Sequence, residues 1–234
     1  MSRRIDAVIF DLDGTLVDSQ PAVLRATKEA LARFDINVSD DEVRERFGGG
    51  SRNIMSYFLV RDLGKANANK KIDEAVEAKN SLQVEYSTNV ALLSGVKQLL
   101  SQLKQDGFLI GIATMGAGDV ARRVLSHNRI DTYFSRVLTV DDVTNPKPDP
   151  EILVKTAKQL GVDVSRSLYV GDSSHDLEAA KAVGMPFVLA DTGLFVDGTR
   201  RIDLRQNAQS LGYPVVARDD LESIAEIAKS YSSS

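Results

Sequence analysis

Short apolar segments that end in polar clusters alternate with helical patterns along this chain, and this alternation limits the folds it can adopt. Three segments have the length and the β-branched or large apolar composition of buried strands: 5–10, 108–113 and 167–170. Weaker strand candidates are 136–140, 186–189 and 213–216. Helical patterns lie between or after them, at 96–105, 119–127, 150–160, 176–183 and 221–229. This order predicts an α/β fold, a Rossmann-like parallel sheet with helices on both faces.

One long region, 16–89, departs from this alternation because it has helical patterns and no convincing strand. Ser39 and Glu42 fit a capping box at a helix start. Farther on, Ile72, Val76, Lys79 and Gln83 lie along a long polar helix. We therefore expect an all-helical domain, 16–89, inserted into an α/β core formed by 1–15 and 90–234, with hinges near 15–18 and 88–93.

Composition and charge exclude several classes of protein. The formal net charge of −4 argues against broad binding to nucleic acid or to an anionic membrane. No stretch has the roughly 18 apolar residues of a membrane span, and Asp11 interrupts the N-terminal apolar run before a signal sequence can form. Cysteine is absent, which excludes disulfides and a thiolate nucleophile. We expect a cytoplasmic protein.

The first polar cluster, Asp11 to Thr15, follows the first predicted strand. In extended backbone, residues two apart point to the same side, so the carboxylates of Asp11 and Asp13 can face one pocket. Two close carboxylates repel each other unless a cation or a proton intervenes, and an all-oxygen ligand set suits Mg²⁺. A solvated turn or a helix cap is the alternative for this pattern.

The second cluster, Thr114 to Gly118, follows the strand at 108–113. A hydroxyl followed by small residues at a helix start offers an Oγ donor and backbone N–H groups to a phosphate. The same segment satisfies a dinucleotide-binding fingerprint through Gly116, Gly118 and Ala121, with Asp141 at about the right distance. A plain strand-to-helix turn is the third interpretation.

Two further clusters complete the set of polar residues at predicted strand ends. Prolines on both sides of Lys147 restrict its backbone, while Asp149 and Pro150 fit the N-cap and first residue of a helix. Asp172 and Asp176, after the strand at 167–170, share one face if a helix starts between them. Four aspartates, a lysine and a hydroxyl at one edge of a sheet match phosphoryl transfer through a carboxylate nucleophile.

These four clusters, in this order, resemble the four motifs of the haloacid dehalogenase superfamily. The segment from Phe10 to Thr15 resembles the first motif, Thr114 the second, Lys147 the third, and Gly171 to Asp176 the fourth. The resemblance covers essentially the whole chain, since the helical region lies where that superfamily has its first type of cap. It implies that the sheet has its first strand in the centre.

The resemblance also implies a role for each residue. Asp11 would attack phosphorus, and Asp13 would protonate the leaving oxygen and then activate water. Thr114 and Lys147 would hold the phosphoryl oxygens, with Met115 beside them where many relatives have asparagine. Mg²⁺ would be bound by Asp11, Asp172 and the Asp13 carbonyl, and supported by Asp176.

Asp13 and the glycine-rich segment of the cap bear on the choice of substrate. A dehalogenase lacks the second aspartate, so Asp13 favours phosphoryl transfer over carbon–halogen cleavage. Gly49, Gly50, Ser51 and Arg52 are expected to meet the non-phosphate end of the substrate, with Arg52 on a carboxylate or second phosphate. The three glycines at 48–50 can also simply end one helix and permit a sharp turn.

The activity expected from this resemblance is hydrolysis of a small phosphorylated metabolite, with 2-phosphoglycolate as the preferred substrate. A phosphomutase of the β-phosphoglucomutase type is the alternative enzyme, and a non-catalytic binding module is the alternative outside enzymes. We expect a monomer or a homodimer.

Overall fold

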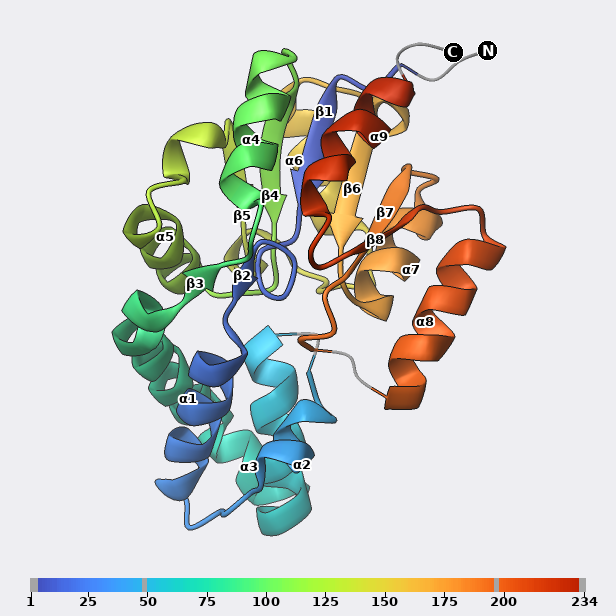
Figure 1. Ribbon diagram of the computed structural model, residues 1–234. Coiled ribbons are helices and arrows are strands. Elements are labelled where there is room, and N and C mark those ends of the chain that lie inside the picture. Colours follow the sequence, from blue (N-terminus) through green and yellow to red (C-terminus); the bar gives the residue numbers. More distant parts are fainter. Residues whose placement is uncertain (1–3, 48–49, 196–197, 232–234) are drawn as a thin grey trace.

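A six-stranded parallel sheet forms the centre of the protein, in the order β5-β4-β1-β6-β7-β8 (Figure 1). The computed structural model describes residues 4–47, 50–195 and 198–231. The strands are β1 (Ala7–Phe10), β4 (Leu109–Ala113), β5 (Arg136–Leu138), β6 (Ser167–Gly171), β7 (Phe187–Asp191) and β8 (Val215–Ala217). The first strand is central, flanked by β4 and β6, and the predicted α/β class is confirmed.

Helices cover both faces of the sheet because successive strand residues point to opposite sides. Val8 and Phe10 of β1 belong to one apolar cluster, and Ala7 and Ile9 belong to another. The first cluster includes side chains of α4 (Val96–Gln105), α5 (Gly118–His127) and α9 (Ile224–Ser230). The second includes side chains of α6 (Glu151–Leu160), α7 (Ser174–Ala182) and α8 (Gly198–Ser210).

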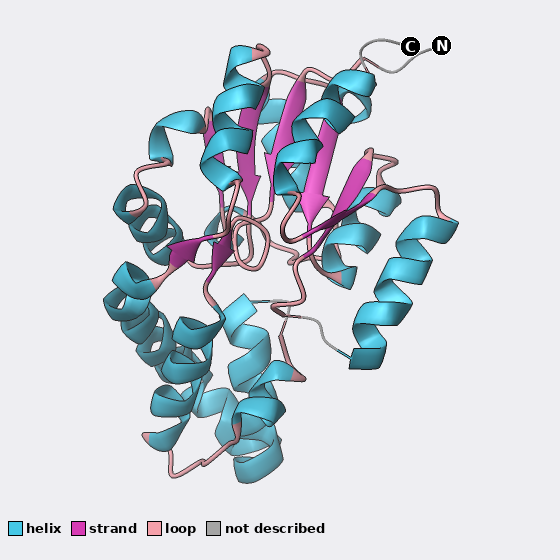
Figure 2. Cartoon of the chain, in the orientation of Figure 1, coloured by secondary structure: helices cyan, strands magenta, loops and turns pink. Residues whose placement is uncertain are grey.

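A helical block lies beyond the carboxyl ends of the sheet strands (Figure 1). It consists of α1 (Gln20–Ala32), α2 (Asp40–Arg44) and α3 (Gly50–Tyr86), and Figure 2 shows that these elements form a layer of their own. Ser39 and Glu42 form the predicted capping box at the start of α2. Gly64, at φ 74°, breaks α3 into two helical segments, so that the chain turns without leaving the block.

The expectation of no strand between 16 and 89 was wrong. Val17–Asp18 forms β2, which pairs antiparallel with β3 (Ala91–Leu92). This two-stranded ribbon joins the core to the helical block at the predicted hinge positions. Two residues are too short for a period-two pattern, and the pairing exists only because the chain returns to the core more than 70 residues later.

Several predicted boundaries differ from the structure by a few residues. Pro150 is the N-cap of α6 rather than its first residue, and Asp149 Oδ1 accepts a hydrogen bond from the Glu151 N–H (2.9 Å). The region predicted as one helix at 221–229 is divided at Ile224. Helix α8 was missed because two buried residues, Leu204 and Ala208, are too few to give it a helical pattern of apolar side chains.

The 3₁₀ helices are η1 (Ser87–Asn89), η2 (Asp131–Tyr133), η3 (Val140–Asp142), η4 (Val164–Arg166) and η5 (Leu221–Ser223). Within the described ranges, no helix is long and apolar enough to cross a membrane.

Candidate active site

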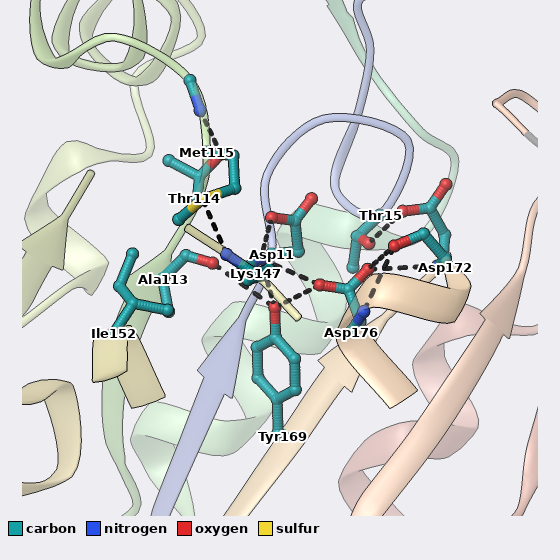
Figure 3. A network of polar contacts seen from close by, with 12 residues as sticks. Asp11, Thr15, Ala113, Thr114, Met115, Lys147, Ile152, Tyr169, Asp172 and Asp176 are labelled. Carbon is teal, nitrogen blue, oxygen red and sulfur yellow. Dashed lines mark hydrogen bonds and ion pairs between the residues drawn. The ribbon is translucent and has the colours of Figure 1, made fainter. Parts of the chain in front are cut away.

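The four polar clusters meet at the carboxyl ends of β1, β4 and β6 (Figure 3). These strand ends point toward the helical block (Figure 1). Asp11 follows β1 directly, Thr114 follows β4 and Asp172 follows β6. Asp176 lies in the first turn of α7, and Lys147 reaches the same point from the loop before α6. Parallel strands bring their carboxyl ends to one edge, so residues more than 130 positions apart become neighbours.

Lys147 connects the segments that follow β1 and β6 through hydrogen bonds to their aspartates. Its ammonium donates hydrogen bonds to Asp11 Oδ1 (2.7 Å), Asp176 Oδ1 (2.8 Å) and the Tyr169 hydroxyl oxygen (2.6 Å). The side chain is 3% exposed. All three ammonium protons therefore have an acceptor, and the lysine is held as a fixed positive charge beside Asp11. The charges of Asp11 and Asp176 raise the pKa of Lys147 above its ordinary value despite burial.

Tyr169 belongs to this network and was not identified from the sequence. It lies in β6 with its ring in the apolar core, and its hydroxyl donates to Asp176 Oδ1 (2.6 Å). Asp176 also caps its own helix, where Oδ2 accepts from the N–H of Ser173 (3.1 Å). The available signal was a tyrosine between two apolar residues, Leu168 and Val170, and its partner, Lys147, became visible only in the fold.

Asp11, Asp172 and Asp176 are arranged as a possible metal site. Each offers one carboxylate oxygen, and these oxygens lie within 4.8 Å of one another. Thr15 Oγ1 donates to Asp172 Oδ1 (3.3 Å). Gly14 passes close by at φ 83°, where a Cβ would lie 2.4 Å from Asp172 Oδ2, so this position requires glycine. Hard oxygen ligands at this spacing fit a divalent ion such as Mg²⁺.

The charge balance of the site fits a bound cation as well. Burial, followed by the charges of neighbouring carboxylates, raises the pKa of Asp11 to about 7 even though Lys147 opposes the shift. Burial, then Asp176 and Asp11, raises the pKa of Asp172 well above its usual range. One lysine thus does not neutralise these buried carboxylates, and a divalent ion would supply the missing positive charge.

Asp13 and Thr114 face the same point of the cavity from neighbouring strand ends. A Cβ built on Gly116 would lie 3.2 Å from Asp13 Oδ2 and 3.5 Å from Thr114 Oγ1, so the glycine leaves both groups room. Thr114 is 1% exposed, and its Oγ1 accepts a hydrogen bond from the Gly116 N–H (3.1 Å). Burial raises the pKa of Asp13. Met115 lines the cavity too, and its sulfur accepts from the Lys147 N–H (3.3 Å).

A cavity of about 120 Å³ lies between these residues and the helical block. The core contributes the carboxylates, Thr114, Met115 and Lys147, and the block contributes Gly50, Ser51, Lys79 and Gln83 together with apolar side chains. Lys79 is 2% exposed, and burial lowers its pKa to about 8. In the sequence it was one position on a polar helix, with nothing to mark it as part of a site.

The residues predicted to line the cap side of the site are only partly brought together. Gly50 and Ser51 line the cavity, whereas Arg52 lines a separate groove and forms an ion pair with Asp73 on the exposed side of α3. Gly49 lies outside the described residues. Consecutive residues of a helix point about 100° apart, and this step turns Arg52 away from the cavity toward Asp73.

Asp141 has a structural role at the segment that resembles a dinucleotide-binding fingerprint. Its Oδ2 accepts a hydrogen bond from the Gly118 N–H (2.8 Å) at the first residue of α5. A dinucleotide would place its pyrophosphate at this helix start. A carboxylate of the protein already lies there, which argues against that interpretation.

Comparison with known proteins connects this geometry with a family. The family model described as "Haloacid dehalogenase-like hydrolase" matches residues 8–190, which include Asp11, Thr114, Lys147, Asp172 and Asp176. The chain belongs to the haloacid dehalogenase-like hydrolases. The order of its sheet and the helical block after β1 agree with the fold that the sequence motifs implied.

Named relatives lie within this hydrolase family. The chain is 34% identical over 204 residues to a phosphoglycolate phosphatase from Salmonella typhi, covering 80% of this chain and 81% of the relative. A structure described as a "predicted phosphoglycolate phosphatase" from Haemophilus somnus 129pt has a TM-score of 0.78 at 24% identity, over 95% of this chain and 97% of that one. A variant of CbbY from Rhodobacter sphaeroides in complex with xylulose-(1,5)bisphosphate has a TM-score of 0.72 at 25% identity, over 80% and 86% of the two chains.

Proposed function

We propose that this hydrolase is a Mg²⁺-dependent phosphatase that acts on a small phosphate monoester through an aspartyl-phosphate intermediate on Asp11. Its family and its named relatives place it among the phosphoric monoester hydrolases. The preferred substrate is 2-phosphoglycolate, after the relatives of that name. A cavity of about 120 Å³ supports a small ester, since it lies below the roughly 300–1,000 Å³ of pockets for larger ligands.

The observation that carries this proposal is the position of Asp11. Its carboxylate lies at the floor of the cavity with one oxygen bonded to Lys147 and with Asp172 and Asp176 beside it. A carboxylate is a weak nucleophile toward a phosphate dianion unless the negative charges are screened. Lys147 and a divalent ion on the same carboxylate group would provide that screening.

The neighbouring residues have complementary roles in this proposal. Asp11 attacks phosphorus, while Thr114 and Lys147 bind phosphoryl oxygens, with Met115 holding the Lys147 backbone in place. Lys147 would exchange one of its three present acceptors for a phosphoryl oxygen when substrate binds. Asp13 gives its proton to the leaving oxygen and then takes a proton from the water that attacks the aspartyl phosphate. A raised pKa suits Asp13 to this exchange, because the group must carry a proton before the first step.

Asp11, Asp172, the Asp13 carbonyl and Asp176 would hold Mg²⁺ in this proposal, Asp176 as support. The bound ion would neutralise charge on the transferred phosphoryl group. The helical block, residues 16–89, would act as a cap over the core formed by 1–15 and 90–234, with β2 and β3 as its hinge. Closure excludes water from the reaction, and product release requires reopening.

Activity with and without metal tests this function. The protein is expected to hydrolyse p-nitrophenyl phosphate with Mg²⁺, to lose this activity in EDTA, and to recover it when Mg²⁺ is added in excess. Without substrate, saturating Mg²⁺ should raise the melting temperature, since a ligand at 100 times its Kd stabilises a protein by about 2.7 kcal/mol.

Asp172→Asn is the matched variant for the metal effect. It should abolish the rise in melting temperature with Mg²⁺, because the amide has no negative charge to bind the ion. The amide has the same shape as the carboxylate, so the packing of the loop should not change. Hydrolysis that proceeds at the same rate in EDTA would contradict the proposed dependence on Mg²⁺.

A further inference from the structure

Lys79 projects from α3 into the cavity on the side opposite the carboxylates of the core. It is 2% exposed, and among the described residues it has no carboxylate within ion-pair distance. The other buried lysine of the cavity, Lys147, lies between two carboxylates. An ammonium that is buried without an ion pair is costly. The charge of Asp13 favours the ammonium, but Asp13 forms no ion pair with it, so Lys79 keeps a positive charge without a direct carboxylate partner among the described residues.

The neighbours of Lys79 fix its direction without neutralising it. Its ammonium donates to Ser51 Oγ (3.0 Å) and to Gln83 Oε1. The Ser51 hydroxyl donates in turn to Asn80 Oδ1 (2.7 Å), which keeps the serine oxygen available as an acceptor for Lys79. An ammonium has three protons, and the third has no acceptor among the described residues. Neutral acceptors thus position the group and leave one donor for a ligand.

We propose that Lys79 binds a carboxylate at the non-reacting end of the substrate, so that the cap selects phosphate monoesters that carry a second, monoanionic group. This inference rests on the proposed phosphatase function and deepens it. The charge fits a carboxylate because one ammonium balances one negative charge. A second phosphate would bring nearly two charges, and such groups are commonly bound by the paired donors of arginine.

The rest of the cavity wall supports a short acid over a sugar. Beside Lys79, the wall includes the apolar side chains of Val23, Phe47, Ile54 and Phe195. A polyhydroxy substrate would leave several hydroxyls against these surfaces without hydrogen-bond partners, at a cost for each. A phosphorylated short hydroxy acid presents an anion at each end and only methylene groups between them.

A pair of matched esters tests the proposal. 2-Phosphoglycolate and ethyl phosphate share the phosphate and the methylene carbon and differ by a carboxylate in place of a methyl group. In the wild type, kcat/KM should be much higher for 2-phosphoglycolate. Lys79→Met should lower kcat/KM for 2-phosphoglycolate by about 100-fold, the loss expected for a hydrogen bond to a charged group. The same change should alter kcat/KM for ethyl phosphate by less than about threefold, because that ester makes no such bond.

Two further variants separate recognition from a structural effect. Lys70→Met removes an exposed lysine from the same helix and should leave both esters unchanged. Gln83→Leu removes a group that positions Lys79, and it should lower kcat/KM for 2-phosphoglycolate alone. Equal losses on the two esters in Lys79→Met, or no loss on 2-phosphoglycolate, would overturn the role of Lys79. Failure of the wild-type protein to hydrolyse p-nitrophenyl phosphate would instead overturn the phosphatase function.

Discussion

Asp11→Asn is expected to lower kcat for p-nitrophenyl phosphate by at least about 10⁴-fold, in line with the loss of a nucleophile in other enzymes. An amide has the shape of the carboxylate but does not attack phosphorus. The protein should stay folded, because Lys147 keeps its ion pair with Asp176. Burial and neighbouring carboxylates raise the pKa of Asp11 to about 7, so at pH 8 the group is ionised in the folded protein, at a cost in stability that the unfolded chain does not have.

Without metal, the melting temperature of Asp11→Asn at pH 8 should therefore be no lower than that of the wild type. The expected change in stability follows from the raised pKa of Asp11. The neutral side chain of asparagine removes a negative charge that destabilises the folded state. Asp6→Asn, at the opposite end of β1, is the control for kcat. Loss of activity together with a large fall in melting temperature would point to a structural role for Asp11.

Lys147→Met is expected to damage both stability and catalysis. It should lower the free energy of unfolding by about 3–5 kcal/mol, the usual cost when one partner of a buried ion pair is removed. Asp11 and Asp176 would be left buried without the ammonium that now bonds to both. Activity should fall as well, because the phosphoryl oxygens and Asp11 lose a fixed positive charge.

Two further variants test whether the loss of stability in Lys147→Met comes from the buried ion pairs. Lys155→Met breaks an exposed ion pair with Glu151, and should change the free energy of unfolding by no more than about 1 kcal/mol. Adding Asp176→Asn to Lys147→Met should restore part of the lost stability, since it removes one of the stranded charges. Urea unfolding without metal measures both effects. A free energy of unfolding for Lys147→Met close to that of wild type would contradict the ion-pair arrangement.

The α/β class and the position of the acidic cluster were predictable from local patterns. A buried strand followed directly by Asp11 fixes the carboxylate at a strand end whatever the rest of the chain does. The same holds for Asp172 after β6 and for Thr114 after β4. Parallel strand order then brings these ends together, because helices of sufficient length separate the strands.

The missed features depend on contacts between distant segments. β2 has only two residues and exists through its pairing with β3, so no local pattern marks it. Lys79 faces the cavity because α3 packs against α1 and over the core, and a lysine on a polar helix gives no sign of burial. Arg52 fitted the expected chemistry, but the helix phase at the start of α3 directs it to Asp73 instead.

A phosphoryl group on Asp11 is the most direct evidence for the proposed chemistry, and Asp13→Asn is the variant in which to seek it. p-Nitrophenolate leaves without an acid, so the first step should proceed in this variant, whereas hydrolysis of the intermediate lacks its base. Mixing this variant with p-nitrophenyl phosphate and Mg²⁺ should release a burst of about one equivalent of p-nitrophenol per enzyme, as for other covalent intermediates. Acid quenching, digestion and mass spectrometry should then find the phosphoryl group on the peptide that contains Asp11, and not in the variant that also carries Asp11→Asn. Steady release of p-nitrophenol with no burst and no phosphorylated peptide would contradict a covalent mechanism.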